Sequence, residues 1–347
     1  MQALKKVFYR DRWLYLLSVS IVLLDGLLLW VTNNWEYFEI SWYIDLFPKA
    51  TLVTLLIVVI GQLIYLVGIR HPSPLGFYWR QLKSLLKHWP ECVNFILLSI
   101  AFSWTFSAYT SVKSAIPSIL PYSMDPIFVQ LDKWLHFGLS PWQISHDLFS
   151  TAYATGVINL LYQIWFAVIW LFLVGSMALV IKPKLRQSAL LGFIAVWFIN
   201  GTLFALPLSS VGPVFYNHIY PPLEEFSSLM NQLEEHHQWL IDSGSSLKVW
   251  SLNVQDKLWT AYSTQTNMTG QGISAMPSMH VSTTFLITLA LWSFNRWAGA
   301  MGILFTLSIL VGSVHLGWHY AIDGYLSLIT TYCIWNLIGK LSKNQVL

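Results

Sequence analysis

The chain has 347 residues, of which 55% are apolar and only 10% charged, and its formal net charge is +3 at pH 7. A soluble domain normally carries about a quarter charged residues. The low charge content and several apolar runs of about 20 residues exclude an ordinary soluble protein and indicate a polytopic α-helical membrane protein. The two cysteines, Cys92 and Cys333, fall in or beside apolar runs, so the sequence suggests neither a disulfide framework nor a zinc motif.

We expect an all-α fold with about eight transmembrane helices, at residues 13–31, 50–69, 93–112, 156–180, 188–208, 278–295, 298–315 and 319–339. The first run is too long for the core of a signal peptide and lacks a small-residue cleavage site, so it is interpreted as a retained span. No repeat or soluble domain interrupts the pattern. Residues 1–347 are therefore expected to form one membrane domain: N-terminal spans (1–112), an outer loop (113–155) and a C-terminal region (156–339) containing a second outer loop (209–277).

The basic residues predict the orientation of the spans, because lysine and arginine accumulate on the cytoplasmic side of membrane proteins. In the eight-span arrangement the side with both termini carries fourteen of them: Lys5, Lys6, Arg10, Arg12, Arg70, Arg80, Lys83, Lys87, Lys182, Lys184, Arg186, Arg296, Lys340 and Lys343. The other side carries five, spread over longer loops: Lys49, Lys113, Lys133, Lys248 and Lys257. We therefore expect a multi-pass protein of the plasma or inner membrane with cytoplasmic termini. Topology accounts for the positive charge, so no nucleic-acid partner is expected.

The outer loop at 209–277 contains an amphipathic segment. Its apolar stripe recurs at three- and four-residue steps and comprises Leu223, Phe226, Met230, Leu233, His237 and Leu240. This spacing predicts a helix that lies on the membrane surface or covers the end of the bundle. A solvated helix that packs on the bundle only for stability is an equally good interpretation.

The first polar patch is "AMPSMHVSTT", residues 275–284, at the entrance to the sixth predicted span. Pro277 suits a first helical position, where its missing N–H costs nothing. Ser278 and His280 would then lie in the first turn, beside unpaired backbone N–H groups that can bind an anion such as phosphate. Ordinary helix capping, with His280 merely interfacial, is the alternative.

The second patch is "HLGWHYAIDGY", residues 315–325, between the last two predicted spans. Gly317 can end one span, and the next would begin near His319. His319 and Asp323 are then four residues apart, on one face of a helix. A carboxylate that binds one imidazole nitrogen leaves the other free as base or nucleophile. A buried pair that only joins helices would have the same spacing.

The third patch is "PLSSVGPVFYNHIYPP", residues 207–222, just beyond the fifth predicted span. A plain glycine–proline turn explains most of it, and Tyr216 and His218 are its candidates for substrate contact. The predicted topology places all three patches on the outer side of the membrane. Ionisable groups gathered at one end of an apolar bundle are typical of a functional site.

Two of these patches resemble a known family. "PSMH" (277–280) and "GSVHLGWHYAIDGY" (312–325) resemble the second and third signature motifs of the phosphatidic-acid-phosphatase type 2 superfamily, usually written P-S-G-H and S-R-x5-H-x3-D. The resemblance covers residues 156–339. The segments "LDKWLHFGLSPW" and "GPVFY" look like the branch of inositol phosphorylceramide synthases and related inositol phosphotransferase-like bacterial proteins. The resemblance implies a six-helix catalytic core bundle, with interfacial helices in the outer loops.

The resemblance also implies roles for individual residues. His319 matches the nucleophile that becomes a phosphohistidine, Asp323 the carboxylate that orients it, and His280 the acid that protonates the leaving alcohol. Ser278 and Pro277 would contact the phosphate, as would Ser313 and His315. The implied partners are the bilayer and a lipid with a phosphate head group, and no metal or other cofactor is implied.

The departures from the family pattern bear on the substrate. Met279 replaces the motif glycine, Ser313 stands where the third motif usually has arginine, and the lysine and arginine of the first motif are absent from residues 207–222. A phosphate monoester dianion prefers arginine and lysine contacts, whereas a phosphodiester carries about one charge fewer. The sequence therefore favours head-group transfer from a lipid phosphodiester over hydrolysis of a lipid phosphate or pyrophosphate monoester. Lys248, Lys257, His218 or His315 could still supply charge from the loops.

Two other classes of protein remain as alternatives. His315, His319 and Asp323 at four-residue steps, with His236 and His237, could form the histidine boxes of a membrane metalloenzyme. A non-enzymatic transporter could instead use the polar residues inside predicted spans, namely Asp25, Asn159 and Gln163.

Overall fold

A computed structural model describes residues 2–266 and 270–343, and this part of the chain is helical throughout, with no β-strand. Six helices are long and apolar enough to cross a membrane: α1 (Gln2–Val31), α2 (Leu46–Gly68), α4 (Trp89–Ile119), α7 (Ala152–Ala178), α8 with its π-helical continuation η2 (Pro183–Phe204), and α13 (Arg296–His315). The other two predicted spans correspond to α12 (Met279–Phe294), which has 16 residues, and α14 (Ala321–Lys343), which has 23. The prediction of an all-α membrane protein is confirmed.

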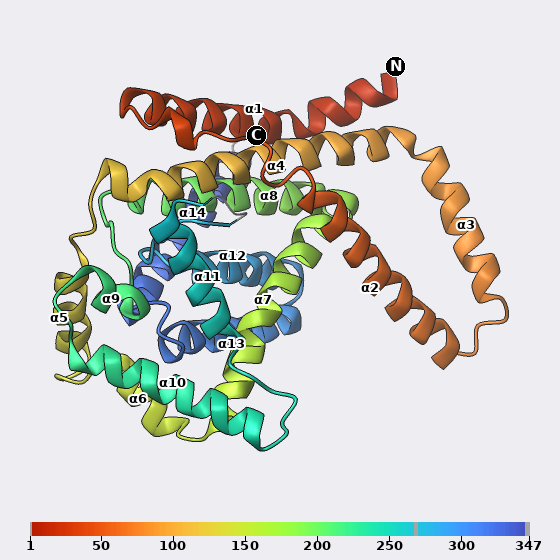
Figure 1. Cartoon of the computed structure of the whole chain (residues 1–347). Coiled ribbons are helices and arrows are strands. Elements are labelled where there is room, and N and C mark those ends of the chain that lie inside the picture. Colours follow the sequence, from red (N-terminus) through yellow and green to blue (C-terminus); the bar gives the residue numbers. More distant parts are fainter. Residues whose placement is uncertain (1, 267–269, 344–347) are drawn as a thin grey trace.

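The helices that form the centre of the molecule come from both halves of the chain. α12 and α13 form an antiparallel hairpin, and α7, α8 and α14 pack against it. α1 and α4 lie side by side and cover α8 (Figure 1). One cluster of buried side chains therefore includes residues of both the N-terminal spans and the C-terminal region.

A buried ion pair fixes the α1 layer onto α8. The guanidinium of Arg186 donates to both carboxylate oxygens of Asp11, at 2.6 and 3.0 Å, and the side-chain amide of Asn94 on α4 donates to the same carboxylate at 2.7 Å. Charged groups are costly at membrane depth unless they are paired, so separation of Asp11 from Arg186 would be unfavourable. The contacts therefore hold α1, α4 and α8 together at the end of the bundle that carries the N-terminus.

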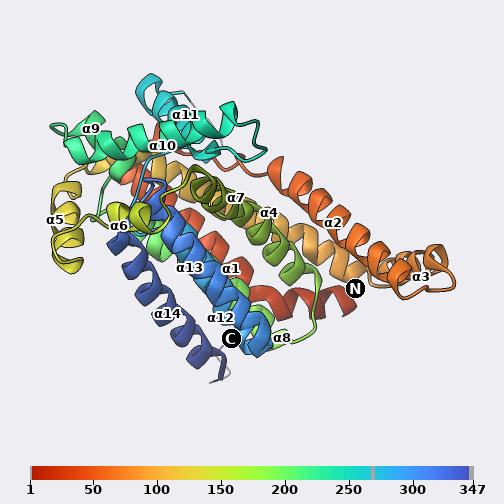
Figure 2. The same cartoon turned by 90° about the horizontal axis from the view of Figure 1, so that it is seen from below.

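Short helices gather at the opposite end of the bundle. They are α5 (Asp125–Leu135), α6 (Pro141–Leu148), α9 (Pro213–Ile219), α10 (Glu224–Asp242) and α11 (Trp250–Thr264). In Figure 2 these helices lie at one end of the long helices, whereas the start of α1, the far end of α14 and helix α3 (Pro74–Lys87) lie at the other. The amphipathic segment predicted at 223–240 is α10, whose buried residues Phe226, Leu229, Leu233 and Leu240 face the bundle and which packs on α7.

Three details differ from the sequence-based expectation. α12 begins at Met279 with Ser278 as its N-cap, so Pro277 precedes the helix instead of occupying its first position. α14 begins at Ala321, so His319 lies in the connection before the helix. α4 continues to Ile119, so Lys113, which was expected just past the end of a span, lies within the helix.

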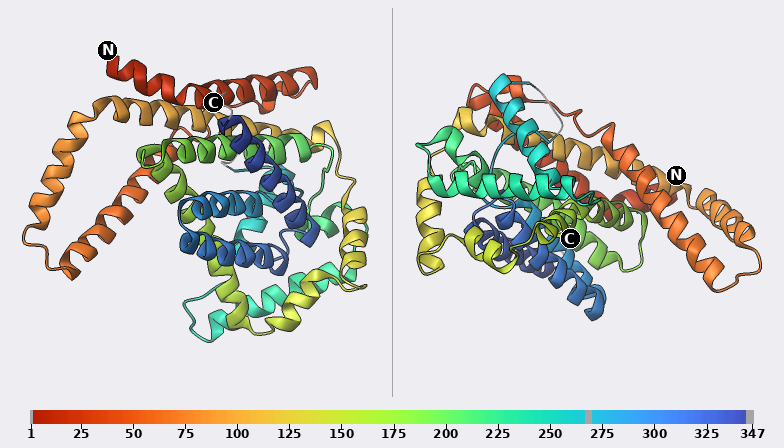
Figure 3. Two further views of the ribbon diagram at one scale, coloured as in Figure 1. Left: turned by 180° about the vertical axis from the view of Figure 1, so that it is seen from behind. Right: turned by 60° about the horizontal axis from the view of Figure 1, so that its bottom comes forward.

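α2 and α3 stand apart from the rest of the molecule. Figure 3 shows them from two sides as an arm, drawn in orange, that projects from the bundle. Phe47, Ala50 and Thr54 in the first turns of α2 are buried, as is Leu66 near its other end, whereas most of the residues between them are exposed. α2 packs on α7 of the bundle and on α3 of the arm.

Candidate active site

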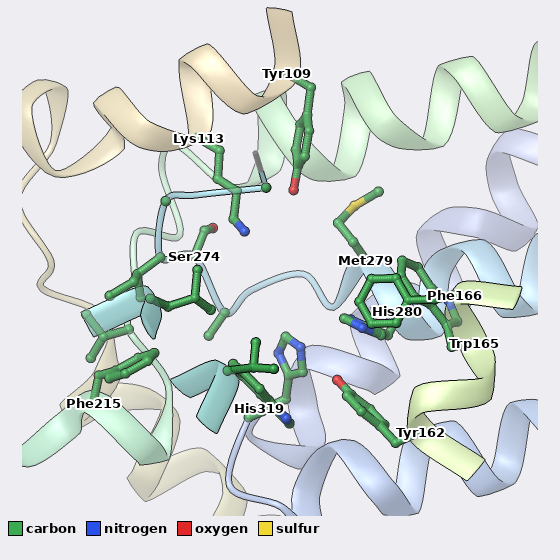
Figure 4. A pocket seen from close by; sticks show the side chains of 18 of the residues that line it. Tyr109, Lys113, Tyr162, Trp165, Phe166, Phe215, Ser274, Met279, His280 and His319 are labelled. Atoms are coloured by element: carbon green, nitrogen blue, oxygen red, sulfur yellow. The ribbon is translucent and has the colours of Figure 1, made fainter. Parts of the chain in front are cut away.

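A cavity of about 290 Å³ lies at the end of the bundle that carries the short helices, and both histidines of the predicted pair of motifs line it. Its walls come from α4, α7, α8 and α11, and from the segments that precede α12 and α14. Figure 4 shows His319 and His280 facing the open space from different sides, with Tyr162 near both of them. Segments far apart in the sequence thus converge on one site.

His319 and Asp323 form the pair that the sequence suggested. Nδ1 of His319 lies 3.2 Å from Oδ2 of Asp323. Because an ionised carboxylate can only accept, Nδ1 carries the proton in this pair and Nε2 keeps a free lone pair. Asp323 is fully buried and also accepts a hydrogen bond from the backbone N–H of Tyr320 at 3.1 Å. The carboxylate therefore holds both the imidazole and the first turn of α14.

The connection between α13 and α14 fixes the position of His319. Gly317 has φ +73°, a left-handed conformation that glycine adopts without strain and that ends α13. The chain then turns back, and the backbone N–H groups of Trp318 and His319 both donate to the carbonyl of Ser313, at 3.0 and 3.1 Å. Ser313 thus supports the histidine through its backbone, while its hydroxyl donates to the carbonyl of Leu310.

Helix α5 supplies two carboxylates that support this connection and that the sequence reasoning missed. Asp132 accepts hydrogen bonds from the first backbone N–H groups of α14, those of Ala321 and Ile322, at 2.8 and 3.0 Å. Burial raises the pKa of Asp132, and these two N–H groups act in the opposite direction. Negative charge at a helix N-terminus is stabilising. Asp132 therefore fixes the start of the helix that carries Asp323.

Asp125 joins the third polar patch to the same region. Its carboxylate accepts from the backbone N–H groups of Val211 and Gly212 and from the hydroxyl groups of Tyr220 and Tyr320, all within 3.1 Å. Both carboxylates lie in or beside the "LDKWLHFGLSPW" region. The partners of Asp125 lie 86 to 195 residues further along the chain, and nothing in the local sequence indicates these contacts.

The N-terminus of α12 forms another wall of the site. The hydroxyl of Ser278 caps the helix by accepting from the N–H of Val281, and the backbone N–H of Ser278 donates to the carbonyl of Asp323 at 3.4 Å. Ser327 on α14 donates its hydroxyl proton to the carbonyls of Ser278 and Asp323. The two helix starts are therefore tied together, and the first N–H groups of α12 have no acceptor within the helix.

His280 is enclosed by aromatic rings of α7. Its ring stacks on Tyr162, with centroids 4.6 Å apart and an interplanar angle of 17°, and lies 4.0 Å from the centroid of Trp165. The indole N–H of Trp165 donates to the hydroxyl of Thr283, which fixes the ring. The ring centroids of His280 and His319 are 6.5 Å apart. A phosphorus centre can therefore be approached by both imidazoles from different sides.

Lys113 is the residue of the cavity wall that the sequence analysis did not assign to the site. It extends from α4 toward the open space (Figure 4), and among the described residues that line the cavity it is the one lysine, with no arginine, aspartate or glutamate beside it in the wall. Gly272, at φ +87°, lies so close to the backbone of Lys113 that a Cβ there would be 2.9 Å from its carbonyl oxygen. The segment before α12 thus packs over Lys113. In the sequence Lys113 directly follows an apolar run, and this position gives no sign of the contact.

Several predicted contact residues lie outside the cavity wall. Tyr216 on α9 is buried against Tyr220 and Phe226, and His218 stacks on Trp259 with centroids 4.2 Å apart. Neither lines the cavity, and neither do Lys248 and Lys257. Pro277, Ser278 and Ser313 do not line it either. Ser313 contacts the lining residue His319 through its backbone carbonyl.

His315 points away from the cavity into a separate group of side chains. Its Nε2 lies 2.9 Å from the hydroxyl of Thr155 and its Nδ1 3.2 Å from the hydroxyl of Ser145, and its ring stacks on His146 with centroids 3.8 Å apart. His146 in turn donates from Nε2 to the carbonyl of His315 at 2.9 Å. Burial lowers the pKa of His146 to about 4, so this ring is neutral near pH 7. The group holds the end of α13 against α6.

The histidine-box arrangement is not present among residues 2–266 and 270–343. In this part of the chain no group of three or more histidine, cysteine, aspartate or glutamate side chains has the geometry to hold a metal ion. His319 and Asp323 face each other, whereas His315 is turned toward Thr155 and Ser145. The donor set therefore does not fit a metal centre.

Fold and site together define a helical membrane protein with an enclosed histidine–aspartate pair facing a second histidine. The sequence model described as the PAP2 superfamily matches residues 127–337, which include both histidines and Asp323. The chain belongs to this superfamily, whose members are generally phosphatases and phosphotransferases, and the family implies a lipid phosphate substrate for a chain embedded in a membrane. Comparison with curated proteins and with solved structures finds no match.

Proposed function

We propose that this protein is a membrane-embedded lipid phosphotransferase that moves a phosphate-linked head group between lipids through a phosphohistidine. The observation that carries the proposal is the pairing of His319 with Asp323, because it leaves Nε2 free beside a cavity that also contains His280 and Lys113. The proposal goes beyond family membership in naming the nucleophile, the acid and the type of phosphate ester.

In the first step, Nε2 of His319 attacks phosphorus and the bond from phosphorus to the lipid oxygen breaks. His280 gives its proton to that oxygen, so the lipid leaves as an alcohol. In the second step, the hydroxyl of the acceptor attacks the same phosphorus and breaks the phosphorus–nitrogen bond. His280 takes the acceptor's proton, and His319 returns to its starting state. His319 thus acts first as the nucleophile and then as the leaving group, while His280 acts first as the acid and then as the base.

Lys113 and the N-terminus of α12 supply the positive electrostatic potential that this reaction needs. The ammonium group and the first N–H groups of the helix favour the oxygens on which negative charge develops. A single lysine matches the single charge of a phosphodiester better than the double charge of a monoester, which prefers two or more cations. The cavity wall therefore favours a diester donor.

The distribution of basic residues supports an outer location for the reaction. α3, with Arg80, Lys83 and Lys87, lies at the end of the bundle opposite the cavity, on the same side as the start of α1 (Figure 2). Because basic residues favour the cytoplasmic side, we place both termini in the cytoplasm and the cavity at the extracytoplasmic face.

The test is to trap the phosphoenzyme. Purified protein is incubated with phospholipids labelled with ³²P in the phosphate, then quenched in alkali, in which phosphohistidine survives. We expect label on His319, and we expect His319→Ala to lose label and turnover by on the order of 1,000-fold or more. His280→Ala should still accept label from a lipid with a good leaving group, because such a group needs no proton.

Mass spectrometry of the products distinguishes transfer from hydrolysis. A new lipid that carries the donor's head group supports the proposal. Rapid release of inorganic phosphate from phosphatidic acid, without head-group transfer, would instead identify a lipid phosphate phosphatase. Turnover or transport that is unchanged in His319→Ala would reject the enzymatic proposal altogether.

A further inference from the structure

A second, apolar cavity of about 170 Å³ adjoins the catalytic cavity. The two share five lining residues, namely Tyr43, Trp165, Phe166, Trp197 and Gly270. The described residues around the second cavity include no charged side chain. A ligand that occupies both cavities would therefore have a charged end near Lys113 and an apolar end in the second cavity.

The second cavity extends from the site toward the middle of the membrane. On α7 its wall runs from Trp165 to Leu173, which corresponds to about 12 Å along a helix. The opposite wall consists of Phe106 on α4 and Phe193 on α8, whose ring centroids are 6.0 Å apart. This depth and lining suit a hydrocarbon chain that hangs from a head group at the membrane surface.

The first turn of α2 closes the cavity on the side of the projecting arm. Phe47 is 1% exposed, and its ring meets Trp170 of α7 edge-on at a centroid distance of 5.0 Å. Leu46 forms part of the same wall. Beyond Thr54 most of α2 is exposed and apolar, so the contact between α2 and α7 is short. The Phe47–Trp170 pair therefore lies directly beside the part of the cavity wall formed by Leu46 and Trp170.

We propose that the second cavity is the tail slot of the lipid substrate: one acyl chain lies between α2, α4 and α7 while the phosphate of the same molecule lies at His319. The lipid enters sideways from the bilayer, through the Phe47–Trp170 contact. The slot thereby makes α2, which lies outside the segment matched by the family, a determinant of the acyl-chain length that the protein accepts. This inference rests on the proposed function for the identity of the ligand.

The experiment measures where an acyl chain lies, independently of turnover. Phosphatidylcholine and phosphatidylglycerol with a diazirine at the end of one acyl chain are crosslinked in nanodiscs to wild type and to His319→Ala, and labelled peptides are located by mass spectrometry. We expect label at the start of α2 and on α7 near Leu173. Ile169→Trp places a larger side chain in the slot and should reduce this label about tenfold, whereas the matched control Ile164→Trp, exposed on the same helix, should change it less than about twofold.

Leu46→Trp serves as a second filling variant from the α2 side, in case Ile169→Trp fails to fold. Wild-type label spread over the lipid-facing helices, or equal label in filled and control variants, would overturn the slot. Slot labelling without head-group transfer would refute the proposed function alone. Transfer without slot labelling would refute the slot alone.

In active protein, filling the slot should also reduce turnover of dipalmitoyl substrates about tenfold more than that of dihexanoyl substrates.

Discussion

At the scale of single residues, the proposed contact between Lys113 and the phosphate of the substrate can be tested by substitution. Lys113→Met keeps the length of the side chain but removes the charge that faces the cavity. We expect kcat/KM for lipid phosphotransfer to fall about 100-fold, as for the loss of one electrostatic contact to a transition state, and Lys113→Arg to retain part of the activity. Lys257→Met, an exposed lysine of α11, is the matched control and should retain activity. Equal loss in both variants would contradict the assignment.

The same residue illustrates what one sequence can reveal. His319 and Asp323 are four residues apart, so their pairing follows from local geometry and was predictable. Lys113 reaches the site only because α4 packs beside the segment that precedes α12, and a single sequence holds no signal for that contact. His315 shows the reverse case: it is close to His319 along the chain, yet the left-handed turn at Gly317 directs the two side chains to different neighbours.

At the scale of elements, α5 caps the N-terminus of α14 through the carboxylate of Asp132. Asp132→Ala removes the acceptor for two backbone N–H groups of that start. The loss of such a cap typically costs about 1 kcal/mol of stability, and a displaced first turn would misplace Asp323. We expect a lower melting temperature and a roughly tenfold lower kcat with little change in KM.

Asp132→Asn keeps one carbonyl acceptor and should restore part of that kcat. Asp147→Ala, an exposed aspartate of neighbouring α6, is the control and should melt and turn over like wild type. A fall in stability with an unchanged kcat would mean that α5 supports the fold but does not position the catalytic pair.

The elements themselves were largely predictable, and their ends were not. Each of the eight apolar runs corresponds to a helix of the structure, and three- to four-residue spacing located α10. The start of α14 shifts to Ala321 because Asp132 and Asp323 together cap that position. α3 was not predicted, because this short amphipathic helix is neither long enough nor apolar enough to resemble a membrane span.

At the scale of the whole molecule, the orientation in the membrane is open to a direct test. In a background of Cys92→Ser and Cys333→Ser, Ser246→Cys beside α10 should react with a membrane-impermeant maleimide in intact cells. Ser84→Cys on α3 should react only after permeabilisation, because its basic neighbours favour the cytoplasm. Labelling with the opposite preference would place the cavity on the cytoplasmic side.

The division of the cavity wall between two parts of the chain has a consequence for how related proteins diverge. His319, Asp323 and His280, to which we assign the chemistry, all lie within residues 127–337, the part matched by the superfamily. Tyr43, Tyr109 and Lys113 come from the preceding spans. Under the proposed mechanism, exchange of the preceding spans would alter the ligand without altering the chemistry. Two proteins that share all three of these residues would then differ in substrate preference.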